Sequence, residues 1–169
     1  MANHGSHFDP PLLGTVLKRP VAFMAKAELF KIPLLGRVIH ACGAYPVKRG
    51  ASDREAIRSA TNLLNDGWAI GVFPDGTRQE NGRINLPMPG AALLASRSDS
   101  FLLPVAIINS HRALGTGKLL PRFLPIHVRI GKPIQPPTSR RKIDLIRKTE
   151  EIQTCINSLL DKGLIHDEN

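Results

Sequence analysis

Short apolar runs of strand length, separated by longer segments with helical spacing, are the feature of this 169-residue sequence that most constrains its fold. The runs span residues 21–25, 44–47, 69–73, 102–108 and 126–130. This alternation is typical of an α/β domain with a largely parallel sheet. We therefore expect an α/β fold, a largely parallel central sheet flanked by helices, in a single domain over residues 1–169.

Three segments carry helix signals. In SDREAIRSATNLLNDG, Ser52 and Glu55 form a capping box, and Gly67 suits the helix end. Pro33 forces a break or a helix start in the segment that follows the first strand. Residues 139–162 place Ile and Leu on one broad face, opposite Arg and Lys. For this amphipathic helix, packing on the sheet is favoured over lying in a membrane interface.

The charge balance narrows the classes of partner. Lys and Arg number 23 against 14 Asp and Glu, a net charge of +9, which attracts anions. Aromatic residues make up only 5% of the chain, and no nucleic-acid-binding motif is present, which disfavours nucleic acid. Cys42 and Cys155 form no zinc motif and suggest a reducing compartment. Small anions or lipid headgroups are therefore the expected partners.

No apolar run approaches the roughly 20 residues that span a bilayer, and the first residues lack the regions of a signal peptide. We therefore expect a cytoplasmic chain that is soluble or peripheral to a membrane.

The stretch NHGSHFD places His4 five positions before Asp9. The two residues are compatible with a general base and its orienting carboxylate, with two metal ligands, or with polar residues of a frayed end. No HExxH or paired cysteines complete a metal site, so the base and carboxylate are the better functional interpretation. A single HxxxxD arises easily by chance, and the pair alone decides nothing.

The stretch GAYPVKRG ends a predicted strand with Lys48 and Arg49, just before the capped helix. A solvated basic turn is the simplest interpretation. An arginine at the carboxyl end of a parallel strand, beside a helix N-terminus, would also suit a phosphate group.

The stretch FPDGTRQENGR directly follows the apolar run AIGVF. Asp75 and Gly76 belong to a simple turn, and Thr77 and Arg78 add a hydroxyl and a cation at the same strand end. Further along, Pro104 in LLPVAII suggests a bulge or a strand start, in a segment that would line an apolar cleft.

The order of these four segments resembles the glycerolipid acyltransferase family, the group that contains 1-acylglycerol-3-phosphate acyltransferase. The family's blocks are NHxxxxD, a glycine, aromatic and arginine block, FPEGTR, and a short apolar block around a proline. Here they read NHGSHFD, GAYPVKR, FPDGTRQ and LPVAI. The resemblance implies transfer of an acyl group from acyl-CoA or acyl carrier protein to the free hydroxyl of 1-acylglycerol-3-phosphate (lysophosphatidate). It implies no metal and no cofactor.

The resemblance also implies roles for individual residues. His4 matches the general base, and Asp9 matches the carboxylate that orients it. The residues that match the substrate phosphate site are Arg49, Gly76, Thr77 and Arg78, with Lys48 and Asp75 in support. The implied partners are the lysophospholipid, the acyl donor and an anionic membrane surface, with the chain peripheral on the cytoplasmic face. Nucleic acid is not an expected partner.

Two other interpretations stay open beside this one. The acceptor could be another lysophospholipid or glycerol phosphate, because the blocks fix the chemistry and leave the acyl and headgroup pockets undetermined. Alternatively, the chain could be a truncated, non-catalytic lipid or acyl-carrier binding protein, which would use Arg49 and Arg78 without His4.

The sequence departs from the family pattern at three places. Asp75 replaces the glutamate of the third block, and Pro89 stands where a basic residue often precedes a glycine and alanines. Only residues 1–3 precede His4, whereas an apolar strand leads into the family's first block. We therefore expect an unpaired sheet edge and a frayed segment around His4.

Overall fold

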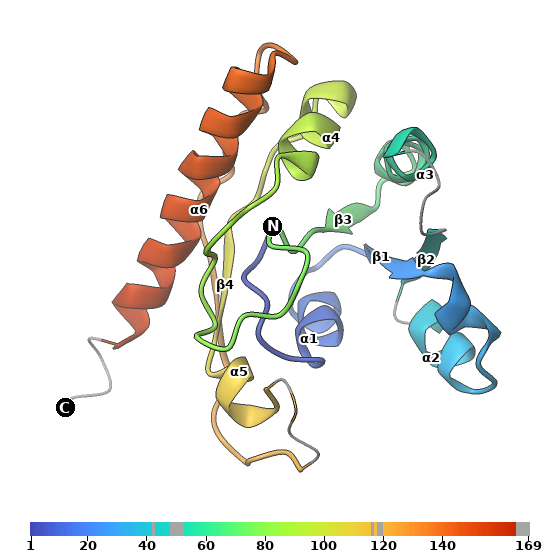
Figure 1. Ribbon diagram of the computed structural model, residues 1–169, viewed down its shortest axis with the longest axis vertical. Helices are drawn as coiled ribbons and strands as arrows, with labels where there is room; N and C mark the ends of the chain where they lie inside the picture. The colour runs from blue at the N-terminus through green and yellow to red at the C-terminus, as the bar shows by residue number, and fades with distance from the viewer. Residues whose placement is uncertain (42, 48–52, 116, 118–119, 165–169) are drawn as a thin grey trace. The chain divides into compact units, whose positions relative to one another are not determined.

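A computed structural model describes residues 1–41, 43–47, 53–115, 117 and 120–164 of the chain (Figure 1). Contacts between residues divide the chain into two compact units. The first unit combines Met1–Asp9 with Phe73–Asn169, and the second unit is Pro10–Val72. Each unit is described by itself below.

The second unit contains a three-stranded parallel sheet in the order β2-β1-β3. Its strands are β1 (Val21–Lys26), β2 (Ala44–Val47) and β3 (Ala69–Gly71). In the register, Phe23 of β1 lies opposite Ala44 of β2 and Gly71 of β3. Because parallel neighbours need crossover connections, helical segments lie between successive strands. The central strand β1 buries Val21, Ala22 and Phe23.

The helical segments of this region are α1 (Asp9–Val16), the 3-10 helix η1 (Ala27–Lys31), α2 (Leu35–Ala41) and α3 (Asp53–Asn65). Pro33 lies between η1 and α2, so the predicted break is confirmed. Gly67 follows α3 with a φ of +86°, the left-handed conformation that suits a glycine after a helix. The predicted capping box depends on Ser52, which lies outside the described residues.

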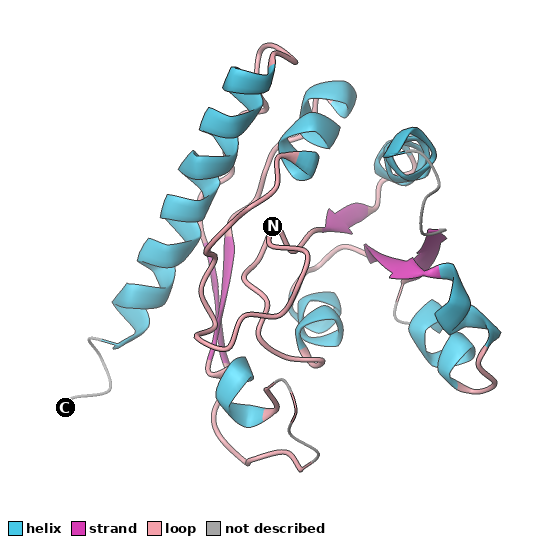
Figure 2. Ribbon diagram, viewed as in Figure 1, coloured by secondary structure: helices cyan, strands magenta, loops and turns pink. Residues whose placement is uncertain are grey.

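The first unit contains β4 (Val105–Ile108), paired with β5 (His127–Ile130) in the antiparallel direction. Its helices are α4 (Gly90–Ser98), the short α5 (Ser110–Ala113) and the long α6 (Lys142–Leu164), shown in cyan in Figure 2. Every residue of β4 is buried, and α6 packs against β4 and α4. The face of α6 that does so buries Ile152, Ile156 and Leu160. The amphipathic helix is thus a packed helix, as predicted.

The residues that precede His4 are paired and buried. Ala2 forms a parallel bridge with Val105, and the Val105 amide donates to the Met1 carbonyl at 2.9 Å. Ala2 and Asn3 are both buried. The expectation of an unpaired edge and a frayed His4 is therefore wrong, because β4 supplies main-chain partners for these residues.

The predicted α/β class is confirmed, with differences in the elements. β3 ends at Gly71 instead of residue 73, and β4 begins after Pro104, which has no amide proton to donate. The β4–β5 pair is antiparallel, unlike the three-stranded sheet. Helix α4, which starts at Gly90, was not predicted, because its run of alanines and leucines follows Pro89, which offers no side-chain N-cap, and shows little contrast between faces.

Candidate functional site

The His4 imidazole is held by a buried carboxylate. Its Nδ1 lies 2.8 Å from Oδ2 of Asp9, which is fully buried. The same oxygen accepts hydrogen bonds from the backbone amides of Gly5 and Ser6, each at 2.8 Å. An Nδ1–H donated to Asp9 leaves Nε2 as the basic nitrogen of the ring. The His4 side chain is 18% exposed, so a substrate proton can reach the imidazole.

The four residues between His4 and Asp9 explain how the carboxylate reaches the ring. The Asp9 amide donates a hydrogen bond to the Ser6 carbonyl oxygen at 3.3 Å, and this bond closes a turn. Helix α1 begins at Asp9. The predicted turn from an extended segment into a helix is therefore present, and it folds the aspartate back onto the imidazole.

Asn3 fixes the backbone from which His4 extends. Its side-chain amide donates to the carbonyls of Gly82 and Ile107, at 2.7 and 2.8 Å, and its Oδ1 accepts from the Ile107 amide at 2.7 Å. These bonds attach the His4 segment to both β4 and the loop of the third block. The motif's asparagine, which sequence reasoning left without a role, thus positions the candidate base.

Phe73, the first residue of the third block, stacks on the His4 ring. The ring centroids are 4.1 Å apart and the planes differ by 18°. The same loop also bonds to His4 directly, because the Gln79 amide donates to the His4 carbonyl at 2.7 Å. Stacking fixes the plane of the imidazole while Asp9 fixes its rotation. Sequence reasoning did not find this role, since a phenylalanine at a strand end normally indicates packing.

Asp75 organises the loop of the third block. Its two carboxylate oxygens accept from the backbone amides of Asn85 and Leu86, at 3.1 and 3.0 Å. Asp75 thus closes the loop on itself, and an aspartate reaches both amides without the extra methylene of the family's glutamate. Gly76 has a φ of +66°, and a Cβ added there would lie 2.7 Å from Cε of Met88. Gly76 therefore provides the turn.

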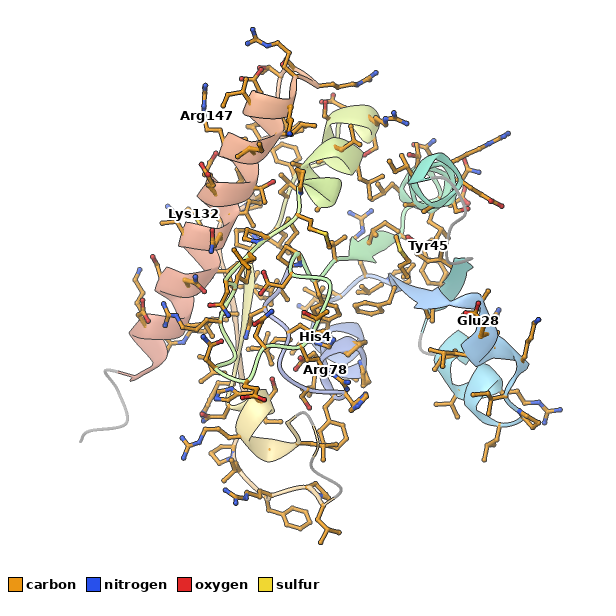
Figure 3. The ribbon with its side chains drawn as sticks, viewed as in Figure 1. His4, Glu28, Tyr45, Arg78, Lys132 and Arg147 are labelled. Atoms are coloured by element: carbon orange, nitrogen blue, oxygen red, sulfur yellow. The ribbon has the colours of Figure 1, made fainter. Side chains whose placement is uncertain are left out.

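Arg78 and His4 both belong to the first unit and are labelled together in Figure 3. The Arg78 guanidinium contacts Nε2 of His7. Burial is the largest cause that lowers the pKa of His7 below 6.5, and the charge of Arg78 lowers it further. A neutral His7 can accept from the guanidinium. Thr77 is exposed beside Arg78.

Helix α6 braces the same loop from its other end. Arg83 forms two bonds to the carboxylate of Asp161, at 2.6 and 3.2 Å. Asn157 exchanges hydrogen bonds with the amide and carbonyl of Ile84, and Gln153 donates to that carbonyl at 2.9 Å. Arg83 is therefore engaged with α6 and does not substitute for the basic residue that Pro89 replaces.

Two glycines allow His111 of α5 to pack against this loop and the His4 segment. A Cβ added to Gly5 would lie 2.6 Å from Cβ of His111, and one added to Gly82 would lie 2.4 Å from its Nδ1. No local pattern indicates this contact, because 106 positions separate Gly5 from His111.

The second block is described only in part. Arg49, a predicted phosphate ligand, and Lys48, predicted to support it, lie outside the described residues. Gly43 has a φ of +79°, and a Cβ there would lie 2.2 Å from the Val21 carbonyl oxygen, so the block's glycine permits β2 to approach β1. Burial raises the pKa of Tyr45 to about 12, which keeps its hydroxyl protonated.

The structure thus brings His4, Asp9 and the third block with Arg78 into one unit. Among the residues that it describes, no cluster of His, Cys, Asp or Glu is arranged to hold a metal ion. In the same part of the chain, no helix is long and apolar enough to cross a membrane. The arrangement can withdraw a proton at His4 and bind an anion at Arg78.

Comparison with known proteins relates this arrangement to a family. Residues 1–108 match the family model described as Acyltransferase. A chloroplast 1-acyl-sn-glycerol-3-phosphate acyltransferase of Arabidopsis thaliana is 29% identical over 123 residues, 72% of this chain and 33% of that protein. A lyso-ornithine lipid O-acyltransferase of Pseudomonas aeruginosa is 36% identical over 78 residues, 46% of this chain and 30% of that protein.

A solved structure gives the same result for the fold. The crystal structure of a 1-acyl-sn-glycerophosphate acyltransferase from Thermotoga maritima superposes with a TM-score of 0.76 at 28% identity. The match covers 94% of this chain and 64% of that one. The matched segments make up between 30% and 63% of the curated relatives' lengths, so the chain corresponds to part of those proteins.

Proposed function

Since this chain belongs to the acyltransferase family, we propose that it transfers a fatty acyl group from acyl-CoA or acyl carrier protein to the free hydroxyl of 1-acylglycerol-3-phosphate. The product would be phosphatidate, an intermediate of phospholipid synthesis. The observation that carries this proposal is the His4 ring, bonded at Nδ1 to a buried carboxylate and stacked on the first residue of the third block.

In the proposed reaction, Nε2 of His4 accepts the proton of the acceptor hydroxyl while that oxygen attacks the thioester carbonyl carbon. The Asp9 carboxylate stabilises the imidazolium that forms. Collapse of the tetrahedral intermediate breaks the carbon–sulfur bond, and the imidazolium returns its proton to the departing thiolate. The products are an ester and a free thiol, and no covalent intermediate with the protein is required.

The acceptor phosphate would bind to Arg78, whose guanidinium can form two parallel hydrogen bonds with phosphate oxygens. Thr77 would add a hydroxyl, and the left-handed turn at Gly76 lets the loop present both side chains. We also propose that Arg49 of the second block binds the acceptor phosphate, with Lys48 in support. The His7 imidazole contacts the Arg78 guanidinium. An incoming phosphate would therefore displace this imidazole as the partner of Arg78.

The acceptor and donor imply where the reaction occurs. A lysophospholipid resides in a bilayer and carries an anionic headgroup, while acyl carrier protein is acidic. A chain with a net charge of +9 is attracted to both. We therefore propose that the protein acts peripherally at the cytoplasmic face of an anionic membrane.

A second candidate acceptor is a lysolipid without a glycerol phosphate. The similarity to a lyso-ornithine lipid O-acyltransferase, at 36% identity over 78 residues, favours considering it. The same base would serve either acceptor, because the reacting hydroxyl is chemically alike. Arg78 would matter less for an acceptor that lacks phosphate, and this difference separates the two candidates.

The test is transfer of a radiolabelled acyl group to lysophosphatidate and to lyso-ornithine lipid, with either donor. We expect His4→Ala to abolish transfer and Arg78→Gln to raise KM for lysophosphatidate alone. Arg83→Gln, which removes a cation engaged with Asp161, is the matched control. Lipid binding that survives His4→Ala without any transfer by the wild-type chain would instead indicate a non-catalytic binding protein.

A further inference from the structure

The turn between η1 and α2 exposes apolar side chains that the acyl-transfer site does not use. Ile32 is 46% exposed, Leu34 73% and Val38 51%. Leu34 directly precedes α2 (Leu35–Ala41), and Val38 lies within that helix. The adjacent cations Lys31 and Arg37 are also exposed. We call these five residues the hairpin tip; Figure 1 shows this turn leading into α2.

Leu34 has an unusual backbone conformation for an exposed leucine. Its φ is +66°, in the left-handed region that branched and bulky residues seldom occupy. An asparagine or glycine would adopt this conformation more easily. The left-handed backbone and the exposed side chain of Leu34 therefore do not help to stabilise the fold. Such a combination points to a role in binding.

The backbone holds the hairpin tip in a defined shape. The Gly36 amide donates to the Ile32 carbonyl at 2.9 Å, and the Val38 amide donates to the Leu34 carbonyl at 3.0 Å. A Cβ added to Gly36 would lie 2.4 Å from the Phe30 carbonyl oxygen, so η1 and α2 approach closely. Because the turn is fixed, binding through its side chains would cost little backbone entropy.

The charges around the tip suit an anionic surface. Residues 10–72 contain nine Lys and Arg against four Asp and Glu, and Glu28 is the acidic residue of the segment 27–41. Apolar side chains flanked by Lys and Arg are the composition that inserts into the interface of an anionic bilayer. A stable protein interface instead buries about 800 Å² on each partner, more than three side chains on a turn provide.

We propose that the hairpin tip inserts its apolar side chains into the headgroup region of an anionic lipid bilayer, with Lys31 and Arg37 bound to lipid phosphates. The proposal extends the lipid-surface action proposed above, but it concerns a separate surface of the second unit. Vesicle binding is measured without donor or acceptor. Its failure is therefore distinguishable from a failure of acyl transfer.

The first experiment measures co-sedimentation of the whole chain with phosphatidylcholine vesicles, with and without one third phosphatidylglycerol. We expect Leu34→Asn to bind the anionic vesicles about fivefold more weakly, since it removes an inserted apolar side chain. The same variant should raise Tm by about 2–4 °C, because asparagine tolerates the left-handed conformation. A purely structural Leu34 would not combine higher stability with weaker binding.

Phe101→Asn is the matched control, since Phe101 is 60% exposed in the first unit and its neighbours in sequence are not basic. We expect it to bind vesicles as the wild type does. A double variant, Lys31→Gln with Arg37→Gln, leaves the turn intact and should lose roughly tenfold in affinity for anionic vesicles, with no change on neutral ones.

Three results would overturn the proposal. The first is unchanged binding of anionic vesicles by both Leu34→Asn and the double variant. The second is an equal loss of binding in Phe101→Asn. The third is a wild-type chain that does not bind vesicles but binds an acidic acyl carrier protein through the same five residues. Tip-dependent vesicle binding without acyl transfer would leave this proposal standing and count against the proposed function alone.

Discussion

The two units differ in the polar side chains that they bury. The polar side chains that the described residues bury all lie in the first unit: Asn3, Ser6, Asp9, Ser110 and Thr149. Both units leave some apolar side chains exposed, and those of the hairpin tip in the second unit lie beside the exposed cations Lys31 and Arg37. Buried polar groups with several partners hold a geometry, whereas exposed apolar groups are available to bind. Acyl transfer at a lipid surface would need both properties.

The largest expected effect comes from removing the charge of Asp9, the buried carboxylate that holds the His4 imidazole. Asp9→Asn should lower kcat about 10⁴-fold, because an amide cannot stabilise the imidazolium and can favour the wrong tautomer. Steady-state transfer kinetics measure this, with the Tm as a check on folding. A loss under tenfold would mean that His4 does not act as the base, and the contrast between the units would then be structural alone.

Asn3 tests whether the buried bonds stabilise the fold. Asn3→Ala leaves the Ile107 amide and two carbonyls without their partner, so we expect a loss of about 3 kcal/mol in the free energy of unfolding. Urea denaturation measures it. Asn62→Ala, on the exposed side of α3, is the matched control and should stay within about 0.5 kcal/mol of wild type.

Phe73 tests how closely the imidazole must be held. Phe73→Leu removes the stacked ring but keeps an apolar side chain, and we expect kcat to fall about tenfold from a misplaced His4. KM for the donor should change little. Phe101→Leu provides the comparison at an exposed phenylalanine. Should kcat stay at the wild-type value, the Asp9 bond alone would be enough to hold the ring.

The smallest expected effect is the pH dependence of His7. Its folded-state pKa is lowered from 6.5, by burial first, then by Arg78 and His4, with Asp9 opposing. The folded state thus binds its proton less readily than the unfolded state does. The contribution to stability is full above about pH 6.5 and is lost as the pH falls through the lowered value.

We therefore expect the Tm of the wild type to fall relative to His7→Gln when the pH is lowered from about 7.5 to about 5. A scan of both proteins at several pH values measures the difference. Parallel Tm curves would show that Arg78 does not depress the His7 pKa, and the contact between the two side chains would carry no electrostatic cost.

Local patterns predicted those parts of the molecule that local forces determine. Pro33 cannot stand in the interior of a helix, and a single turn brings Asp9 back to His4. Other contacts join segments that are distant in the sequence: the hydrogen bonds of Asn3, the stacking of Phe73 on His4, and the bonds from α6 to the third-block loop. Hydrophobic periodicity and local propensity cannot predict such contacts. The segment around His4 was likewise expected to fray, but the residues before it pair with β4, which lies about 100 positions further along the chain.

The bonds of Asn3 also have a consequence for synthesis of the chain. Its two acceptors lie 79 and 104 positions further along the sequence. At about 5–20 residues per second, a ribosome needs on the order of ten seconds to deliver them after Asn3. Until residue 107 has been synthesised, the hydrogen bonds of Asn3 that anchor the His4 backbone are incomplete. The candidate site therefore forms late in translation, and contacts of such long sequence separation slow the last folding steps.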